Sequence, residues 1–114
     1  MFSKQYRLRE SQKIAHVFKI GKHVHGKYIF VKYIPTNKKN AHIAISVSTK
    51  LFKQATKRNR IKRQIREAVK PHLLKLPPMD ILIITKKELK IDIPSKDINT
   101  DISNIFNRLI SPKH

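Results

Sequence analysis

The sequence contains no cysteine and only seven acidic residues in 114. Without cysteine the chain can form no disulfide, no thiolate metal site and no cysteine nucleophile. It also has no apolar run that approaches the ~20 residues of a membrane-spanning helix, and its first twenty residues lack the apolar core of a secretory signal. We therefore expect a cytoplasmic protein.

Positive charge is what the sequence has in excess. Lysine and arginine number 26 against seven acids, which gives a net charge of +19. This density makes a polyanion the natural partner, nucleic acid first and an acidic membrane surface second. The length suits one compact domain with a modest core. We expect a single domain over residues 1–114, with a basic N-terminal arm over 1–10 and a short tail over 111–114.

Hydrophobic periodicity predicts three helices and at least three strands. The expected strands cover residues 28–34, 41–48 and 79–85. A polar turn joins the first two as a hairpin, and the third is apolar enough to be covered on both faces. The element order is helix, strands, helix, strand, helix. It predicts a small α+β sandwich whose sheet is covered mainly on one face.

The helix ends carry their own signals. Ser11 is the predicted N-cap of the first helix, and Gly21 suits a left-handed residue at its end. A long helix is expected over residues 55–70, before Pro71. The last helix begins near Ser95, and Asp97 and Asp101 lie in its first two turns, where they favour the helix dipole.

The helix over residues 55–70 has two contrasting stripes. Segment 50–70 carries nine Lys or Arg against the single acid Glu67. At about 100° per residue, Ile61, Ile65 and Ala68 fall on one apolar stripe. The opposite stripe is a cationic ridge, formed by Asn59, Lys62, Arg63, Arg66 and Lys70. A solvated helix face normally carries both signs of charge, so the ridge indicates nucleic-acid binding.

Arg58 and Arg60 flank this ridge and point in two directions, because two positions along a helix differ by ~200°. Arginine suits such a place, since its planar fork donates paired hydrogen bonds to phosphate. At these residues the sequence becomes specific: Ala55 followed by KRNRIKRQIREA, from Lys57 to Ala68, resembles the signature helix of the ribonuclease P protein family.

The resemblance extends beyond this helix. VFKIG at the end of the first helix, YIFVKY, ISVSTK and MDILIIT follow in family order over roughly residues 6–110. Two departures concern the loop before the signature helix, where Lys53 replaces a common glycine and the loop is one residue longer. The resemblance implies a left-handed crossover between parallel strands, a fold shared with domains of ribosomal and translation proteins such as the second domain of ribosomal protein S5.

The resemblance also implies binding roles. The signature helix contacts the catalytic RNA, through Arg58, Asn59, Arg60, Lys62, Arg63 and Arg66. A cleft between sheet and helices receives the single-stranded 5′ leader of precursor tRNA, through Phe18, Tyr28, Phe30, Lys32, Ser46 and Ser48. If the strand over residues 28–34 is regular, its aromatics and Lys32 share one face and form a stacking platform for unpaired bases. Ordinary core packing is the competing reading of that face.

The carboxylates indicate no protein catalyst. They are scattered along the chain or lie at helix ends, at Glu10, Glu67, Asp80, Glu88, Asp92, Asp97 and Asp101. Phosphodiester cleavage by a protein normally needs several carboxylates on metal ions. The six histidines show no metal spacing, although chemistry leaves acid–base roles open to His16, His42 and His72. We expect no catalytic and no metal-binding residue in the polypeptide, with Mg²⁺ bound chiefly by the RNA subunit.

The expected function is that of the ribonuclease P protein subunit, which assists removal of the leader to give a 5′-phosphorylated mature tRNA. Its expected partners are the catalytic RNA and precursor tRNA, with no membrane and no obligate protein partner. Two alternatives stay open at this point. A ribosomal or assembly protein would share the charge, and a protein-only ribonuclease would cleave without an RNA subunit.

Overall fold

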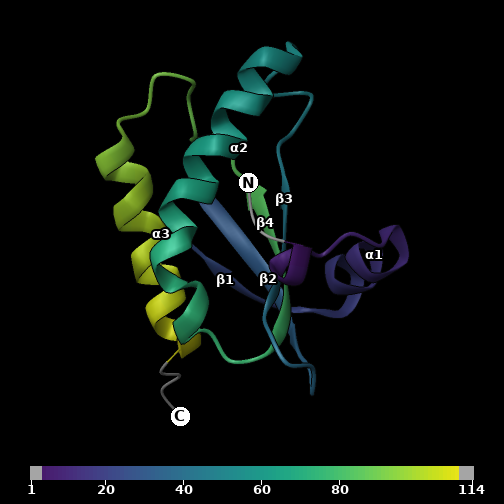
Figure 1. Cartoon of the computed structure of the whole chain (residues 1–114). Coiled ribbons are helices and arrows are strands. Elements are labelled where there is room, and N and C mark those ends of the chain that lie inside the picture. The colour runs from purple at the N-terminus through teal and green to yellow at the C-terminus, as the bar shows by residue number, and fades with distance from the viewer. Residues whose placement is uncertain (1–3, 111–114) are drawn as a thin grey trace.

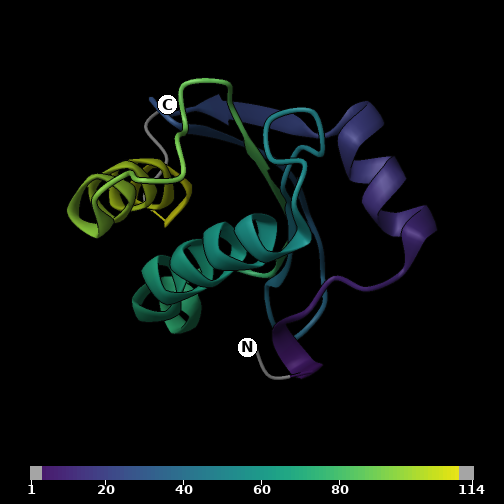
Figure 2. The same cartoon turned by 90° about the horizontal axis from the view of Figure 1, so that it is seen from above.

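The computed structural model describes residues 4–110 of the chain. Four strands form one mixed sheet in the order β1–β2–β4–β3: β1 is Lys22–His25, β2 is Ile29–Pro35, β4 is Met79–Thr85 and β3 is His42–Ser46. The helices are α1 (Ser11–Ile20), α2 (Ala55–Val69) and α3 (Ser95–Ile110), with short 3-10 helices over Lys4–Tyr6 and Lys70–Lys75. Helices α2 and α3 cover one face of the sheet and α1 lies on the other (Figures 1 and 2). The predicted α+β sandwich is confirmed.

The main core lies between the sheet and the α2–α3 layer. Alternate residues of the two central strands point into it, so Ile29 and Val31 of β2 and Ile81 and Ile83 of β4 are almost fully buried. The apolar stripe predicted for α2 meets them through residues such as Ile61. Each large side chain buried in this way stabilises the fold by about 1.5–3 kcal/mol relative to exposure.

The predicted hairpin of β2 with β3 is wrong, because β4 lies between these strands. Strand β4 pairs antiparallel with β2 and parallel with β3. Its side chains are buried on both faces, which favours the centre of the sheet. The neighbour of β2 on its other side is β1, a short polar edge strand with no apolar run to predict it. The parallel pair β3 and β4 and its crossover through α2 agree with the resemblance, and the left-handed sense stays a prediction.

Both predictions for the ends of α1 are wrong. Glu10 occupies the N-cap position, without a side-chain cap hydrogen bond, and Ser11 is already helical. Gly21 has an extended backbone, with φ of −64°. Glycine is required at this position for steric reasons, because a Cβ there would lie 2.5 Å from the carbonyl oxygen of Val17. The close packing of the helix end on β2 explains this residue better than a left-handed turn.

The N-terminal arm is more firmly packed than the sequence indicates. Leu8 is buried, and its N–H donates to the carbonyl of Ile43 at 3.0 Å. Arg7 forms a parallel bridge with the same residue of β3. The arm thus runs along the free edge of β3. Residues 1–3 of the arm and the predicted tail over 111–114 lie outside the described residues.

The sequence predicted that Asp101 interacts with the dipole of α3, but it did not show the main hydrogen-bond partners of this residue. Its carboxylate is buried inside the fold and accepts hydrogen bonds from the backbone N–H groups of Lys27, Tyr28 and Ile29, at 2.7, 2.9 and 3.2 Å. Asp101 therefore ties α3 to the turn between β1 and β2. This contact fixes where strand β2 begins.

Candidate RNA-binding surfaces

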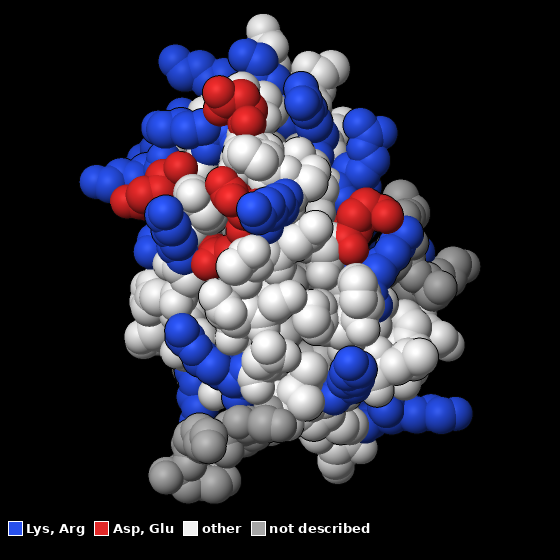
Figure 3. Space-filling model, turned by 90° about the vertical axis from the view of Figure 1, so that its left-hand side faces the viewer, with Lys and Arg blue, Asp and Glu red and all other residues white. Residues whose placement is uncertain are grey.

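The cationic ridge of α2 is open to solvent as predicted. Asn59 and Arg63 are exposed, while Lys62 and Arg66 are half-buried. Lys70 is paired with Glu67 at 2.8 Å, and this ammonium lowers the pKa of the glutamate. The side of the molecule around α3 differs, since acidic residues are interspersed with basic ones above a wide neutral area (Figure 3). The ridge is the more uniformly positive surface.

Arg58 and Arg60 point in two directions, as the sequence predicts. Arg60 is exposed. Arg58 is half-buried, and its Nη1 donates to the carbonyl oxygens of Phe52 and Lys53, both at 2.8 Å. Arg58 therefore anchors the loop before α2. This structural duty was not visible in the sequence, where both arginines looked like ligands for phosphate.

A groove missed by the sequence analysis runs beside the ridge. Lys62 and Arg66 share a hollow of about 320 Å³ with Arg7 and Arg9 of the arm, above apolar residues of β3 and α1. A second, more polar hollow of about 240 Å³ adjoins it at the arm and includes Lys13 and Lys38. In the sequence, the positive charge of the arm was the one feature that pointed to this groove. The arm and α2 are far apart along the chain, so the sequence did not show that they lie close together in space.

The α1 face of the sheet carries a row of partly exposed side chains. Strand register sets His25 opposite Phe30, Phe30 opposite Ile84, and Ile84 opposite Ser46. None of the four is buried, and we call them the open row. The His25 ring stacks on Phe30 with centroids 5.3 Å apart and planes inclined by 25°. The row forms a platform across all four strands.

Phe18 and Lys32 meet beside the open row. The Lys32 ammonium lies 4.4 Å from the centroid of the Phe18 ring and donates to the Phe18 carbonyl oxygen. Phe18 is 54% exposed, so part of its ring remains open to solvent beside Lys32. The structure therefore brings together four of the six residues predicted for the leader, on one face of the sheet: Phe18, Phe30, Lys32 and Ser46.

Tyr28 and Ser48 lie elsewhere, which corrects their predicted placement. Tyr28 precedes β2 and packs against the main core near α3, because its N–H is held by Asp101 before the strand begins. Ser48 follows β3, and its hydroxyl accepts the N–H groups of Lys50 and Leu51 in a turn. The assumed regular strands do not extend to either residue. The alternation of residues along a regular strand therefore put Tyr28 and Ser48 on the wrong surface.

The histidines of the described residues are either exposed or half-buried. His23 and His25 are exposed on β1 with ring centroids 5.0 Å apart. Burial and the Lys38 charge lower the pKa of His42, whose Nδ1 lies 3.7 Å from a carboxylate oxygen of Asp80. Within residues 4–110, no three His, Asp or Glu side chains gather closely enough to hold a metal ion. No helix in the described part of the chain is long and apolar enough to cross a membrane.

Comparison with known proteins gives a consistent result. A family model described as Ribonuclease P matches residues 2–110. The ribonuclease P protein component of Staphylococcus haemolyticus is 33% identical over 118 residues, covering 94% of this chain and 97% of that protein. The RNase P protein of Staphylococcus aureus aligns with a TM-score of 0.78 at 27% identity, over 90% and 93% of the two chains. That of Thermotoga maritima aligns with a TM-score of 0.80 at 26% identity, over 90% and 96%.

Proposed function

Because the chain belongs to the ribonuclease P protein family, it is a subunit of the endoribonuclease that matures tRNA 5′ ends, and we propose how its surfaces divide that work. Its established partner is the ribonuclease P RNA. The family match gives no support to the ribosomal alternative. What remains to be assigned is which residues bind the catalytic RNA, which bind the precursor tRNA, and where the chemistry takes place.

The ridge of α2 and the flanking Arg60 bind the catalytic RNA in this proposal. Exposed guanidinium groups donate paired hydrogen bonds to phosphate, and each neutralised phosphate releases counterions. Within residues 4–110, Lys70 is the one ridge cation with an acidic partner. Arg58 contributes indirectly, by fixing the loop that precedes the helix. The proposed direct contacts come from Asn59, Arg60, Lys62, Arg63 and Arg66, and Arg58 supports them through the loop.

The 5′ leader of precursor tRNA lies across the open row beside α1. Unpaired bases stack on aromatic rings at about 1–3 kcal/mol per base, whichever base is present. Phe18 offers an exposed ring, and Lys32 beside it supplies a charge for the backbone phosphate. The contact between these two side chains is the observation that carries the leader assignment. It joins a stacking surface on α1 to a cation on β2.

The polypeptide positions the substrate, and the RNA subunit performs the cleavage. No three carboxylate or histidine side chains gather within the described residues, and we assign the Mg²⁺ of the reaction chiefly to the RNA subunit. Holding the leader on one surface and the catalytic RNA on another orients the scissile phosphodiester at the RNA's reactive centre. The product is a tRNA with a 5′ phosphate. A cytoplasmic location for this ribonucleoprotein stays a prediction.

A reconstituted cleavage assay tests this proposal. Precursor tRNA is incubated with the full chain alone, the catalytic RNA alone, both together, or neither, at low Mg²⁺ concentration. We expect efficient release of the leader only with both components, and no cleavage by the chain alone. Cleavage by the chain alone would place the chemistry in the protein. An RNA whose cleavage rate is unchanged by the protein would remove the positioning role.

A further inference from the structure

The loops that follow the two parallel strands enclose a hollow that the proposed function does not use. Strands β3 and β4 both end at the top of the molecule in Figure 1, where residues 47–54 and 86–94 connect them to α2 and α3. Residues from both loops and the first turn of α2 surround a space of about 440 Å³. That volume lies within the about 300–1,000 Å³ typical of small-ligand sites. In open sheets, ligands commonly bind beyond the carboxyl ends of parallel strands.

Five lysines line this hollow and no acidic residue does. They are Lys50, Lys53, Lys57, Lys87 and Lys90, and within the described residues none of their side-chain ammonium groups forms a hydrogen bond or ion pair. Glu88 and Asp92 belong to the second loop but do not line the space. Five unpaired ammonium groups at one mouth repel each other unless an anion joins them. The hollow is therefore suited to a ligand that carries phosphate.

The floor of the hollow is apolar. It is formed by the side chains Leu51, Phe52, Leu89 and Ile91. Leu89 and Phe52 are 1% and 5% exposed, whereas Leu51 is 38% exposed. A simple phosphate ion would leave the accessible part of this surface, at Leu51 and Ile91, in contact with water. A ligand with a flat aromatic part as well as phosphate would cover it and meet the lysines together.

The walls are held by specific hydrogen bonds. The Ser48 hydroxyl accepts two N–H groups of the first loop, and Arg58 holds two of its carbonyls. In the second loop, the N–H of Leu89 donates to the carbonyl of Lys86 at 3.0 Å. A site whose walls are already ordered loses less conformational entropy when a ligand binds.

We propose that this hollow binds one unpaired nucleotide of an RNA strand, with the base on the apolar floor and its phosphates among the five lysines. Base-paired RNA does not fit, because its base faces are stacked and cannot reach the floor. The site lies apart from the open row, on the loops that precede α2 and α3. It adds a third contact to RNA beside the two surfaces assigned above, and it does not depend on either of them.

Methyl NMR of the full-length protein tests the site directly. Uridine 5′-monophosphate, ribose 5-phosphate and inorganic phosphate are titrated in turn, and the methyl signals of Leu51, Leu89 and Ile91 are followed. We expect the nucleotide to shift all three and to bind more tightly than the other two ligands. Equal binding of the nucleotide and ribose 5-phosphate would overturn the base contact. Methyl signals that stay unmoved would overturn the site.

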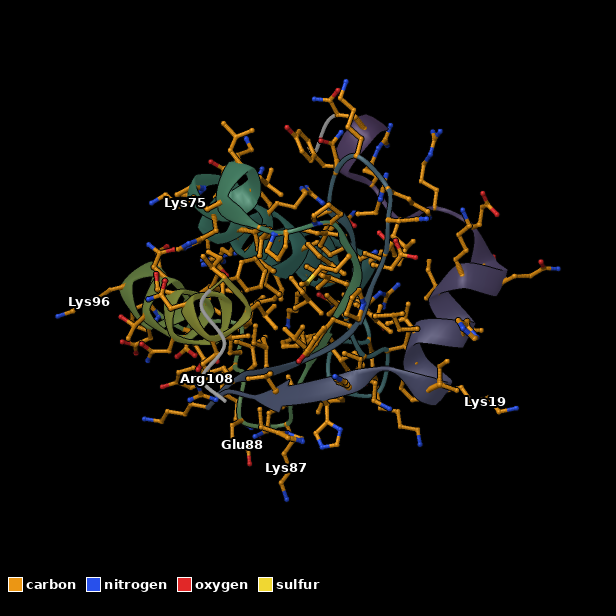
Figure 4. All side chains as sticks on the ribbon, turned by 90° about the horizontal axis from the view of Figure 1, so that it is seen from below. Lys19, Lys75, Lys87, Glu88, Lys96 and Arg108 are labelled. Atoms are coloured by element: carbon orange, nitrogen blue, oxygen red, sulfur yellow. The ribbon has the colours of Figure 1, made fainter. Side chains whose placement is uncertain are left out.

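Matched variants separate this site from general electrostatics. Lys87→Gln combined with Lys90→Gln removes two charges from the hollow, and Lys75→Gln combined with Lys96→Gln removes two charges elsewhere. Figure 4 shows Lys75 and Lys96 on the outer side of the helices, away from Lys87. We expect the first pair to weaken nucleotide binding by about five-fold or more and the second to leave it nearly unchanged. If both double variants lost the same amount of nucleotide affinity, the effect would come from the total charge of the protein, and the proposal would be overturned.

The titration is independent of the cleavage assay, because it contains neither the catalytic RNA nor precursor tRNA. A chain that fails in cleavage but binds the nucleotide keeps this inference and loses the proposed function. The reverse outcome keeps the function and removes the site. Both double variants replace exposed side chains, so we expect them to unfold at the same urea concentration as the wild-type protein. This measurement is the check on folding.

Discussion

The carboxylate of Asp101 fills the space that a side chain on Gly26 would need. A Cβ at residue 26 would lie 2.6 and 2.7 Å from the two carboxylate oxygens, and 2.7 Å from the Cδ1 of Ile105. The same carboxylate binds the three N–H groups that follow Gly26. Glycine is therefore required by close approach of α3 to the turn. Together Gly26 and Asp101 fix where β2 begins, and therefore the position of Phe30 along the strand.

The Asp101 contact predicts a large loss of stability in Asp101→Ala. Three backbone N–H groups would lose their acceptor, and a buried donor left unpaired costs about 1–3 kcal/mol. We expect the free energy of unfolding in urea to fall by at least about 2 kcal/mol. Asp92→Ala, at an exposed loop position, is the matched control and should change it little. Equal stability of the two variants would show that the carboxylate does not hold the turn.

The sequence predicts those elements of the fold whose residues follow one clear pattern of hydrophobicity or charge. The apolar stripe and cationic ridge of α2 follow from helical periodicity alone, and β4 follows from an unbroken apolar run. Strand order is different, because it depends on which strand occupies the centre of the sheet. The apolar content of β4 is compatible with that position but does not specify its neighbours. Strand β1 has almost no apolar content and left no signal.

The candidate sites show the same division. Exposure of Arg60 and Arg63 follows from the charge pattern, whereas the loop-anchoring role of Arg58 requires the path of the backbone before α2. Tyr28 was misplaced because a carboxylate 73 residues away determines where its strand begins. Long-range hydrogen bonds of this kind are invisible to local pattern.

The two arginines of the signature helix should respond differently to substitution. Arg60→Ala should weaken binding to the catalytic RNA and leave thermal unfolding nearly unchanged, because its side chain is exposed. Arg58→Ala should also lower the unfolding temperature, since two loop carbonyls lose their donor. Binding is measured over a range of salt concentrations. Each lost phosphate contact should reduce the slope of log affinity against log salt by roughly 0.7 to 0.9. Identical unfolding temperatures would refute the anchoring role.

His72 should make stability fall on mild acidification. Burial, and secondarily the charge of Lys75, lower the pKa of this imidazole, which lies 3.3 Å from the Ser103 hydroxyl and edge-on to Phe106. The unfolded chain, with a pKa near 6.5, then binds more protons than the folded chain. The free energy of unfolding should therefore decrease as the pH falls from about 6.5 through the folded pKa.

Urea unfolding at several pH values measures this decrease. His72→Gln should reduce the decrease but not abolish it, because burial lowers the pKa of His42 as well. His16→Gln, which changes an exposed histidine, is the control and should keep the wild-type profile. A His72→Gln profile as steep as that of the wild type would contradict the assignment.

The separation of the ridge from the open row is tested most directly by measuring three affinities in the same three variants. The affinities are those of the chain for the catalytic RNA, and of the assembled holoenzyme for tRNA with and without a leader. Phe18→Ala should reduce the preference for leader-bearing tRNA by about five-fold to a hundred-fold, the value of one stacked base, and leave assembly unchanged. Arg60→Ala should do the reverse, and Tyr28→Ala, beside α3, should preserve the preference. Equal losses for leader-bearing and leader-free tRNA in Phe18→Ala, or the same loss in Tyr28→Ala, would contradict the account.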